Sequence, residues 1–194
     1  MTGTGVGHWA RWAPLALVLY AAFPVVVCRA VPASARSLEA KETVALNDTV
    51  DDFNAAMSEQ NFERVVRTIP PKVIGSLAGK AKVTPDQIRE LVINLMKTAL
   101  ATVKIESFGM NLKAAEFKEL ASGAPYALIP TITVMDLGDK GRFQQKSHTL
   151  GLLDEGKWYL VRVSEVAQLM ILREVYPEFA GVEFPQGSME VLKK

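Results

Sequence analysis

The sequence predicts an α+β fold in which N-terminal helices pack on a strongly curved antiparallel sheet and a C-terminal helix follows. Up to residue 101, apolar residues recur at intervals of three and four, which is the helical period. Beyond residue 102 the period shortens toward two, and β-branched and aromatic residues become frequent. Because the helices precede the strands instead of alternating with them, the order favours an α+β arrangement over a parallel α/β sheet.

Residues 1–35 have the layout of a signal peptide. An uncharged apolar stretch at residues 13–27 follows Arg11 and leads to a small-x-small site that ends at Ala35. The stretch is shorter than the roughly 20 residues of a membrane-spanning helix, and prolines interrupt it. We therefore expect cleavage near Ala35, a secreted or periplasmic location, and no stable membrane insertion after processing.

Two other outcomes of export stay open. Cleavage could follow Ala30 or Ala33, or the segment could stay as an uncleaved anchor, because Arg11 and the amino terminus are the only positive charges before the apolar stretch. Cys28 is the single cysteine, so a processed chain has none and forms no disulfide. Processing removes Arg11 and Arg29 from the 22 Lys and Arg, which leaves 20 against 21 Asp and Glu.

This balance excludes several functional classes. The basic residues are spread among acidic ones, so we expect no nucleic acid as a partner. Zinc needs several Cys, His or carboxylate ligands in reach, and His148 is the only histidine after processing, so we expect no metal. The processed chain contains neither a Walker loop nor a Gly-x-Ser-x-Gly elbow. We expect no cofactor.

The helical part of the chain is expected to contain three helices. Residues 36–48 are polar and weakly patterned, so we interpret them as a lead-in to a single domain at 49–184. Thr49 would cap the first helix. Asn61 would cap a second, which ends at Pro70–Pro71 because proline has no amide hydrogen to donate.

The third and last helices have clearer boundaries. Thr84-Pro85-Asp86-Gln87 is a capping box with proline at the first helical position, and it predicts a helix over 85–101. Ser164 would cap a last helix over Val166–Val175, which is apolar on most sides. Residues 185–194 are interpreted as a C-terminal tail. Five strands are expected between these helices, at residues 103–111, 115–120, 126–136, 142–153 and 157–163.

Turns at 138–141 and 154–156 predict the strand registers. Opposite residues would have numbers that sum to about 279 across the first turn and about 310 across the second. One sheet face is then free of charge in its central part, and we place it against the helices. With two side chains from the first helix it forms a pocket for a small apolar ligand, lined by Phe53, Met57, Tyr126, Phe143, Gln145, Ser147, Thr149 and Tyr159. A core filled by side chains, with no cavity, is the alternative.

The element order resembles that of the nuclear transport factor 2-like superfamily. The resemblance covers about residues 49–163. The residues that carry it are the helix with Val50, Phe53, Ala56 and Met57, the Asn61-Phe62 restart, and the segment Asp154-Glu155-Gly156-Lys157-Trp158-Tyr159-Leu160-Val161. It implies a cone of bent sheet closed by helices. Members include isomerases, dehydratases, ligand binders and non-catalytic partner modules, so the resemblance bears on fold more than on function.

The preferred function is an exported, non-enzymatic module that binds a small apolar ligand or a protein partner. Catalytic isomerases of the superfamily use a pocket tyrosine with carboxylic acids, and Phe53 stands at the comparable position here. The alternative is an isomerase or lyase that acts on a hydrophobic small molecule, with His148 or Glu106 as the base. The predicted register puts His148 on the outer sheet face. A third reading is an interaction protein with no pocket at all.

Two roles stay open for the last helix, which are packing inside the domain and a homodimer contact. The last helix is apolar on more sides than one buried face requires. Trp158 and Leu160 would extend the same patch on the outer sheet face.

Overall fold

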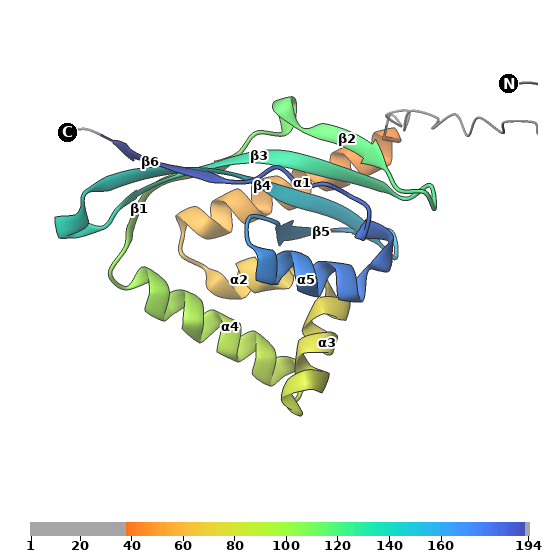
Figure 1. Cartoon of the computed structure of the whole chain (residues 1–194), viewed down its shortest axis with the longest axis horizontal. Helices are drawn as coiled ribbons and strands as arrows, with labels where there is room; N and C mark the ends of the chain where they lie inside the picture. The colour runs from red at the N-terminus through yellow and green to blue at the C-terminus, as the bar shows by residue number, and fades with distance from the viewer. Residues whose placement is uncertain (1–37, 193–194) are drawn as a thin grey trace, which may run out of the picture. The chain divides into compact units, whose positions relative to one another are not determined.

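The α+β fold class is confirmed by the computed structural model, which describes residues 38–192. Four helices precede a strongly curved antiparallel sheet, and a fifth helix follows its first five strands (Figure 1). The predicted signal peptide and its cleavage sites lie outside the described residues. Within residues 38–192, no helix combines the length and the apolar character that crossing a membrane requires.

The sheet is built on one long hairpin. Its six strands are β1 (Lys104–Met110), β2 (Glu116–Glu119), β3 (Pro125–Asp136), β4 (Arg142–Asp154), β5 (Lys157–Arg162) and β6 (Ser188–Leu192). The two longest strands, β3 and β4, pair with each other along almost their whole length. The outer edge of β3 is covered by β2 near its start and by β1 near its end. The outer edge of β4 is covered in the same way by β5 and β6.

The expected helix caps are present in two helices. The helices are α1 (Ala40–Ser58), α2 (Phe62–Arg67), α3 (Pro71–Ala81), α4 (Pro85–Leu100) and α5 (Val166–Val175). The Asn61 side chain accepts a hydrogen bond from the Arg64 amide at the start of α2. Thr84 and Gln87 form the predicted reciprocal capping box of α4, at 3.3 and 2.8 Å. The cap of α5 is Glu165, not Ser164.

The first helix is longer than predicted. It begins at Ala40, so most of the expected lead-in at 36–48 that the structure describes is helical. Glu39 and Glu42 form a capping box at its start. Leu46 of this added stretch of helix is buried. The prediction began the helix at Thr49 and gave no weight to Leu46, although Leu46 lies four residues before Val50 on the same helical face.

Two further segments form secondary structure that was not predicted, namely α3 and β6. Pro71 opens α3 instead of closing a helix, because the first helical residue needs no amide hydrogen. Within the predicted tail at 185–194, Ser188–Leu192 forms β6, which pairs with β4. This pairing joins segments more than 40 residues apart, and local sequence pattern does not encode it.

Both predicted registers are wrong by one residue. Asp136 pairs with Arg142, and Leu153 pairs with Trp158, so the sums are 278 and 311. The second loop is a two-residue turn in which Glu155 and Gly156 both have positive φ, at 51° and 77°. Since side chains alternate along a strand, a slip of one residue moves them to the other face.

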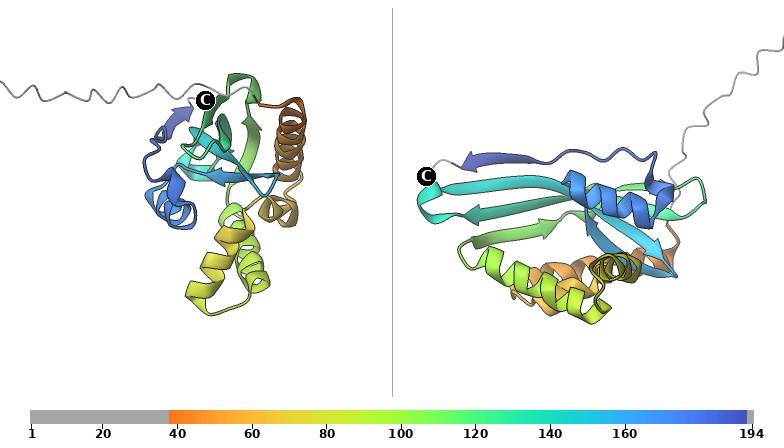
Figure 2. Two further views of the ribbon diagram at one scale, coloured as in Figure 1. Left: turned by 90° about the vertical axis from the view of Figure 1, so that its right-hand side faces the viewer. Right: turned by 60° about the horizontal axis from the view of Figure 1, so that its bottom comes forward.

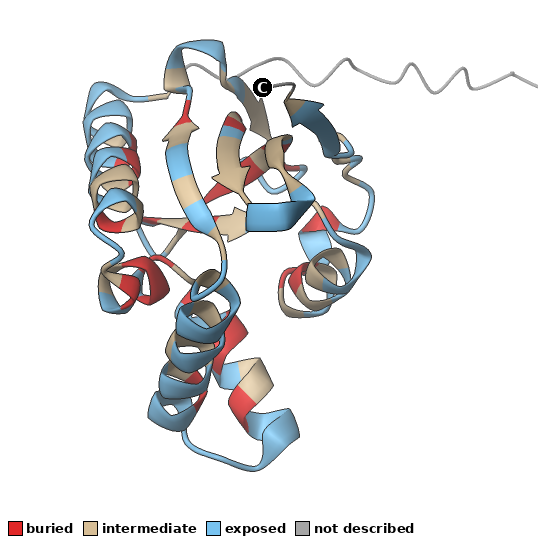
Figure 3. Cartoon of the chain, turned by 90° about the vertical axis from the view of Figure 1, so that its left-hand side faces the viewer, coloured by how far each residue is buried: buried red, intermediate tan, exposed pale blue. Residues whose placement is uncertain are grey.

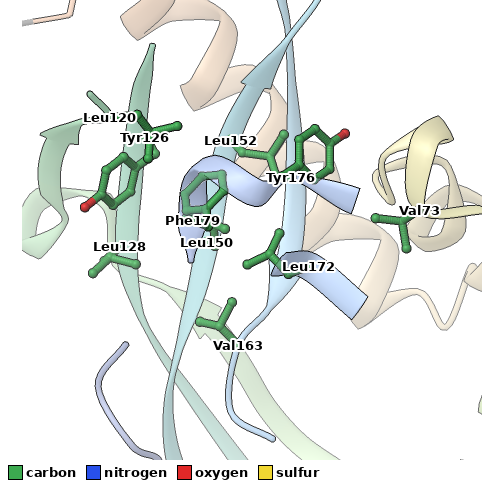
Figure 4. Close-up of a cluster of buried hydrophobic side chains, with 10 residues drawn as sticks. All are labelled: Val73, Leu120, Tyr126, Leu128, Leu150, Leu152, Val163, Leu172, Tyr176 and Phe179. Atoms are coloured by element: carbon green, nitrogen blue, oxygen red, sulfur yellow. The ribbon is translucent and has the colours of Figure 1, made fainter. Parts of the chain in front are cut away.

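The observed register gives the hairpin two faces, covered by different helices (Figure 2). The α1 face carries Ala127, Ile129, Thr131, Thr133, Phe143, Gln145, Ser147, Thr149 and Gly151. The α5 face carries Tyr126, Leu128, Leu150 and Leu152, which form a buried cluster with Leu172 of α5, with Tyr176 and Phe179 after it, and with Val73 of α3 (Figure 4). The predicted inner face mixed residues from both.

The Leu46 side chain of α1 packs over two small residues of the sheet. Ala127 and Gly151 are opposite each other on the α1 face. A Cβ atom on Gly151 would lie 3.3 Å from Cδ1 of Leu46 and 3.6 Å from Cβ of Ala127. Trp158 then anchors the helix, because its indole N–H donates to the Glu42 carbonyl at 3.0 Å. The absence of a side chain at residue 151 therefore allows this contact.

The edge of β5 is closed by α2. The Leu160 amide donates to the Thr68 carbonyl at 2.9 Å, just after the end of α2. This bond satisfies a backbone donor that a strand edge would otherwise leave to water. It also holds α2 against the end of the sheet that carries the cleft described below.

A polar contact links three elements near the turn between β4 and β5. Asp154 accepts hydrogen bonds from the Tyr176 hydroxyl at 2.9 Å and from Lys72 Nζ at 2.6 Å. Lys72 also lies 5.7 Å from the centre of the Tyr176 ring. Burial, with the bond to Asp154, raises the pKa of Tyr176 above its ordinary value.

We predict that Gly151→Val destabilises the protein by about 1–3 kcal/mol, because the added methyl groups overpack the contact with Leu46. Urea unfolding measures the effect. The matched control is Gly109→Val in β1, where a Cβ atom meets no neighbour within 4 Å. Equal unfolding midpoints for the two variants would contradict the close contact between Leu46 and Gly151.

We also predict that the free energy of unfolding falls as the pH rises above about 10. The folded pKa of Tyr176 is raised, so its stabilising contribution is complete below the ordinary tyrosine pKa and is lost above it. Tyr176→Phe should lose less stability than wild type between about pH 9 and about pH 11. Urea titrations at several pH values test this; parallel pH profiles for the two proteins would refute it.

Candidate functional site

A cleft of about 410 Å³ lies beside the α1 face of the sheet, where β5 ends, and it is partly open to solvent. Helices α1, α2, α4 and α5 and the start of α3 contribute to its walls, together with β1, β3, β4 and β5. Its volume is in the range of small-molecule sites. The lining residues are Phe53, Met57, Val65, Thr68, Ile69, Val73, Met96, Phe108, Thr131, Thr133, Gln145, Ser147, Thr149, Leu160, Val161, Arg162, Gln168, Ile171 and Leu172.

The helical walls of the cleft are mostly apolar. Phe53 of α1 and Phe108 of β1 pack with ring centres 5.6 Å apart. Met57 and Met96 add flexible thioether side chains from α1 and α4. In Figure 3, α4 is exposed along most of its length, and only its side toward the other helices is covered. These walls suit an apolar ligand that varies in shape.

The floor of the cleft contains one internally satisfied polar pair. The hydroxyls of Thr131 and Thr149 lie 2.9 Å apart, and Thr131 Oγ1 donates to the Ile129 carbonyl at 3.0 Å. Both threonines are buried. Because each finds a partner inside the protein, this pair needs no ligand to compensate for its burial.

A second group of polar side chains in the cleft has no such partners. Thr133 is opposite Gln145, and Thr131 is opposite Ser147. The side chains of Thr133, Gln145 and Ser147 make no hydrogen bond to the residues that the structure describes. Gln168 Oε1, on α5, is buried and also has no partner within residues 38–192. These groups are available to a ligand or to water.

Arg162 is the one ionisable side chain among the described lining residues. It is the last residue of β5 and is opposite Thr149 on β4. Its Nε lies 3.4 Å from Ser164 Oγ, and its Nη2 lies 3.8 Å from a carboxylate oxygen of Glu165. The side chain is 48% exposed, so the guanidinium lies at the mouth of the cleft. The site therefore combines apolar walls, neutral hydrogen-bonding groups and one cation.

Five of the eight predicted pocket residues line the cleft together: Phe53, Met57, Gln145, Ser147 and Thr149. The other three do not. Tyr126 is on the α5 face, with its ring centre 5.4 Å from that of Phe179. Tyr159 is on the same face, beneath Lys157. Phe143 is opposite Met135 near the far end of the hairpin, beyond the cleft.

Neither candidate catalytic base lines the cleft. His148 is opposite Pro130, not Thr131, and it shares the orientation of Leu150 on the other side of the sheet. Glu106 accepts hydrogen bonds from the Arg142 guanidinium at 3.0 and 3.1 Å. Arg142 holds the pKa of the Glu106 carboxyl below its ordinary value. Glu106 therefore serves as a surface ion-pair partner.

The lining residues that were not predicted include Thr133, Arg162 and Gln168. Thr133 and Arg162 were assigned to the outer face by the slipped registers. Gln168 is the one polar residue in the apolar run from Val166 to Leu172, and this isolation was the available signal.

The prediction that Trp158 and Leu160 belong to an exposed apolar patch on the outer sheet face is wrong. Trp158 and Leu160 are 1% and 4% exposed, because they pack under α1 and beside α2. Helix α5 is partly covered by its own chain through Leu172, while Val166 and Met170 are 74% and 67% exposed. A dimer contact through α5 would therefore lack the contribution from the sheet.

A second hollow of about 430 Å³ lies between α1, α2 and β5 and is mainly charged. Arg64 in its wall already pairs with Asp52 and with Glu59, at 2.5 and 2.7 Å. Within residues 38–192, no group of His, Cys, Asp and Glu side chains is placed to hold a metal ion. The apolar cleft is thus the stronger candidate site.

Comparison of the sequence with protein-family models and with curated proteins finds no match.

Proposed function

We propose that the protein binds a small apolar ligand in the cleft beside the α1 face. The observation that carries this proposal is the contrast between the two polar groups of the cleft. The Thr131–Thr149 pair is satisfied within the protein, whereas Thr133, Gln145 and Ser147 extend from the same strands without partners. These side chains face the partly open cleft, so their hydrogen-bonding groups can exchange water for a ligand.

A binding role is favoured over catalysis by the position of the candidate bases. His148 and Glu106 both lie outside the cleft, and its described lining contains no carboxylate or imidazole. The neutral groups that are present can orient a ligand through hydrogen bonds, and the apolar walls can hold its body. The resemblance to a superfamily that includes ligand binders is compatible with this role.

We predict that the neutral fluorophore N-phenyl-1-naphthylamine binds the wild-type protein with enhanced, blue-shifted emission, and that Thr133→Trp weakens binding about tenfold or more by filling the cleft. Fluorescence titration measures the affinity. Ile132→Trp is the matched control, because it adds the same side chain to the adjacent, outward-facing position, which is 45% exposed.

Gln145→Trp serves as a second blocking variant if Thr133→Trp does not fold, and circular dichroism checks the fold of each protein. Equal affinity for the fluorophore in wild type, a folded blocking variant and Ile132→Trp would place the probe elsewhere on the surface and overturn the proposal.

A further inference from the structure

We infer that the natural ligand is an amphipathic carboxylate, with an apolar body between the helices and an anionic head group at Arg162. This inference rests on the proposed function, because it concerns the ligand of the same cleft. It adds the charge and the orientation of that ligand, neither of which follows from the apolar walls.

The charges around the cleft favour an anion. Arg162 supplies the single formal charge among the described lining residues. Glu165 is the nearest acidic group recorded for it, at 3.8 Å, and its side chain is 61% exposed to solvent. A cationic head group would be repelled by the guanidinium, and the described lining has no acidic side chain to compensate for this repulsion. A carboxylate would instead accept a charge-assisted hydrogen bond from Arg162.

Most N–H donors of the Arg162 guanidinium have no hydrogen-bond partner within residues 38–192. It carries five N–H groups in a planar fork. The structure uses one of them in a long contact to Ser164 Oγ at 3.4 Å, and the separation from Glu165 exceeds hydrogen-bonding distance. At least one edge of the fork can therefore receive both oxygens of a carboxylate.

Neutral donors lie near the same end of the cleft. Arg162 is opposite Thr149, and Ser147 is two residues away on β4. A Cβ atom placed on Gly187 would lie 3.7 Å from Ser147 Cβ and 3.8 Å from Ser164 Cβ, so the two serines flank one point of the backbone. The free Ser147 hydroxyl can thus add a hydrogen bond to a head group held by Arg162.

The apolar end of the ligand has a separate place. The Phe53–Phe108 pair belongs to α1 and β1, and Phe108 is opposite Thr133, so these rings lie across the sheet from β5. Because Met57 and Met96 are flexible, this end can accept chains of different shape. The cleft therefore separates a charged end from an apolar end.

The test is displacement of N-phenyl-1-naphthylamine by decanoate, decanol and decylammonium, which share a chain and differ in head group, each below its micelle concentration. We expect decanoate to displace the fluorophore from wild type at a concentration about tenfold lower than decanol does, and decylammonium to be weakest. Arg162→Gln should abolish the preference for decanoate, so that decanoate and decanol displace the fluorophore at similar concentrations.

Lys157→Gln is the matched control, because it removes one positive charge from the same strand at a residue that does not line the cleft. It should retain the preference for decanoate. Equal potency of decanoate and decanol on wild type, or equal loss in both charge variants, would overturn the inference and leave the proposed function intact. Failure of all three compounds and of the fluorophore to bind would overturn both.

Discussion

The register of the β3–β4 hairpin is the constraint on which the rest of the structure depends. Both strands are flanked on their outer edges by two short strands, so every strand of the sheet takes its position from this pair. The register puts Ala127 opposite Gly151, which leaves room for the Leu46 side chain of α1. It also puts Thr133 opposite Gln145, which places their unbonded polar groups in the cleft. If one strand slipped by one residue, its side chains would change faces, so that Ile132 would replace Thr133 or Lys146 would replace Gln145 in the cleft.

The two faces of the hairpin differ in how closely they are packed. On the α5 face, apolar side chains pack against the last helix and the turn that follows it, and Asp154 ties that turn to α3. On the α1 face, close packing is confined to one end, near Trp158 and Leu46. The other end carries threonine, serine and glutamine, and the helices there leave the cleft open. Because the tight contacts lie at the other end, a ligand can be accommodated without disturbing them.

The fold could be predicted from the sequence to the extent that its signals are local. The capping box at Thr84, the cap at Asn61 and the alternation in the five predicted strands all lie within a few residues of the element they specify. The features that were predicted wrongly depend on contacts between distant segments or on the length of a turn. Strand β6 is defined by a distant partner, and each hairpin register depends on the length of its loop, which is residues 137–141 between β3 and β4 and residues 155–156 between β4 and β5. The site could therefore be predicted only in part: Phe53 and Met57 depend on helical spacing alone, whereas Tyr126, Thr133 and Arg162 depend on the register.

The most direct test of the cleft as a binding site is the side-chain amide spectrum of ¹⁵N-labelled protein titrated with decanoate. Gln145 and Gln168 line the cleft from β4 and α5, while Gln144 is adjacent in sequence and points to the other side of the sheet. Binding as described shifts the side-chain NH₂ resonances of Gln145 and Gln168 in a saturable way and leaves those of Gln144 in place. Shifts at Gln144 alone, or unchanged resonances of Gln145 and Gln168 at saturation, would contradict the assignment of the site.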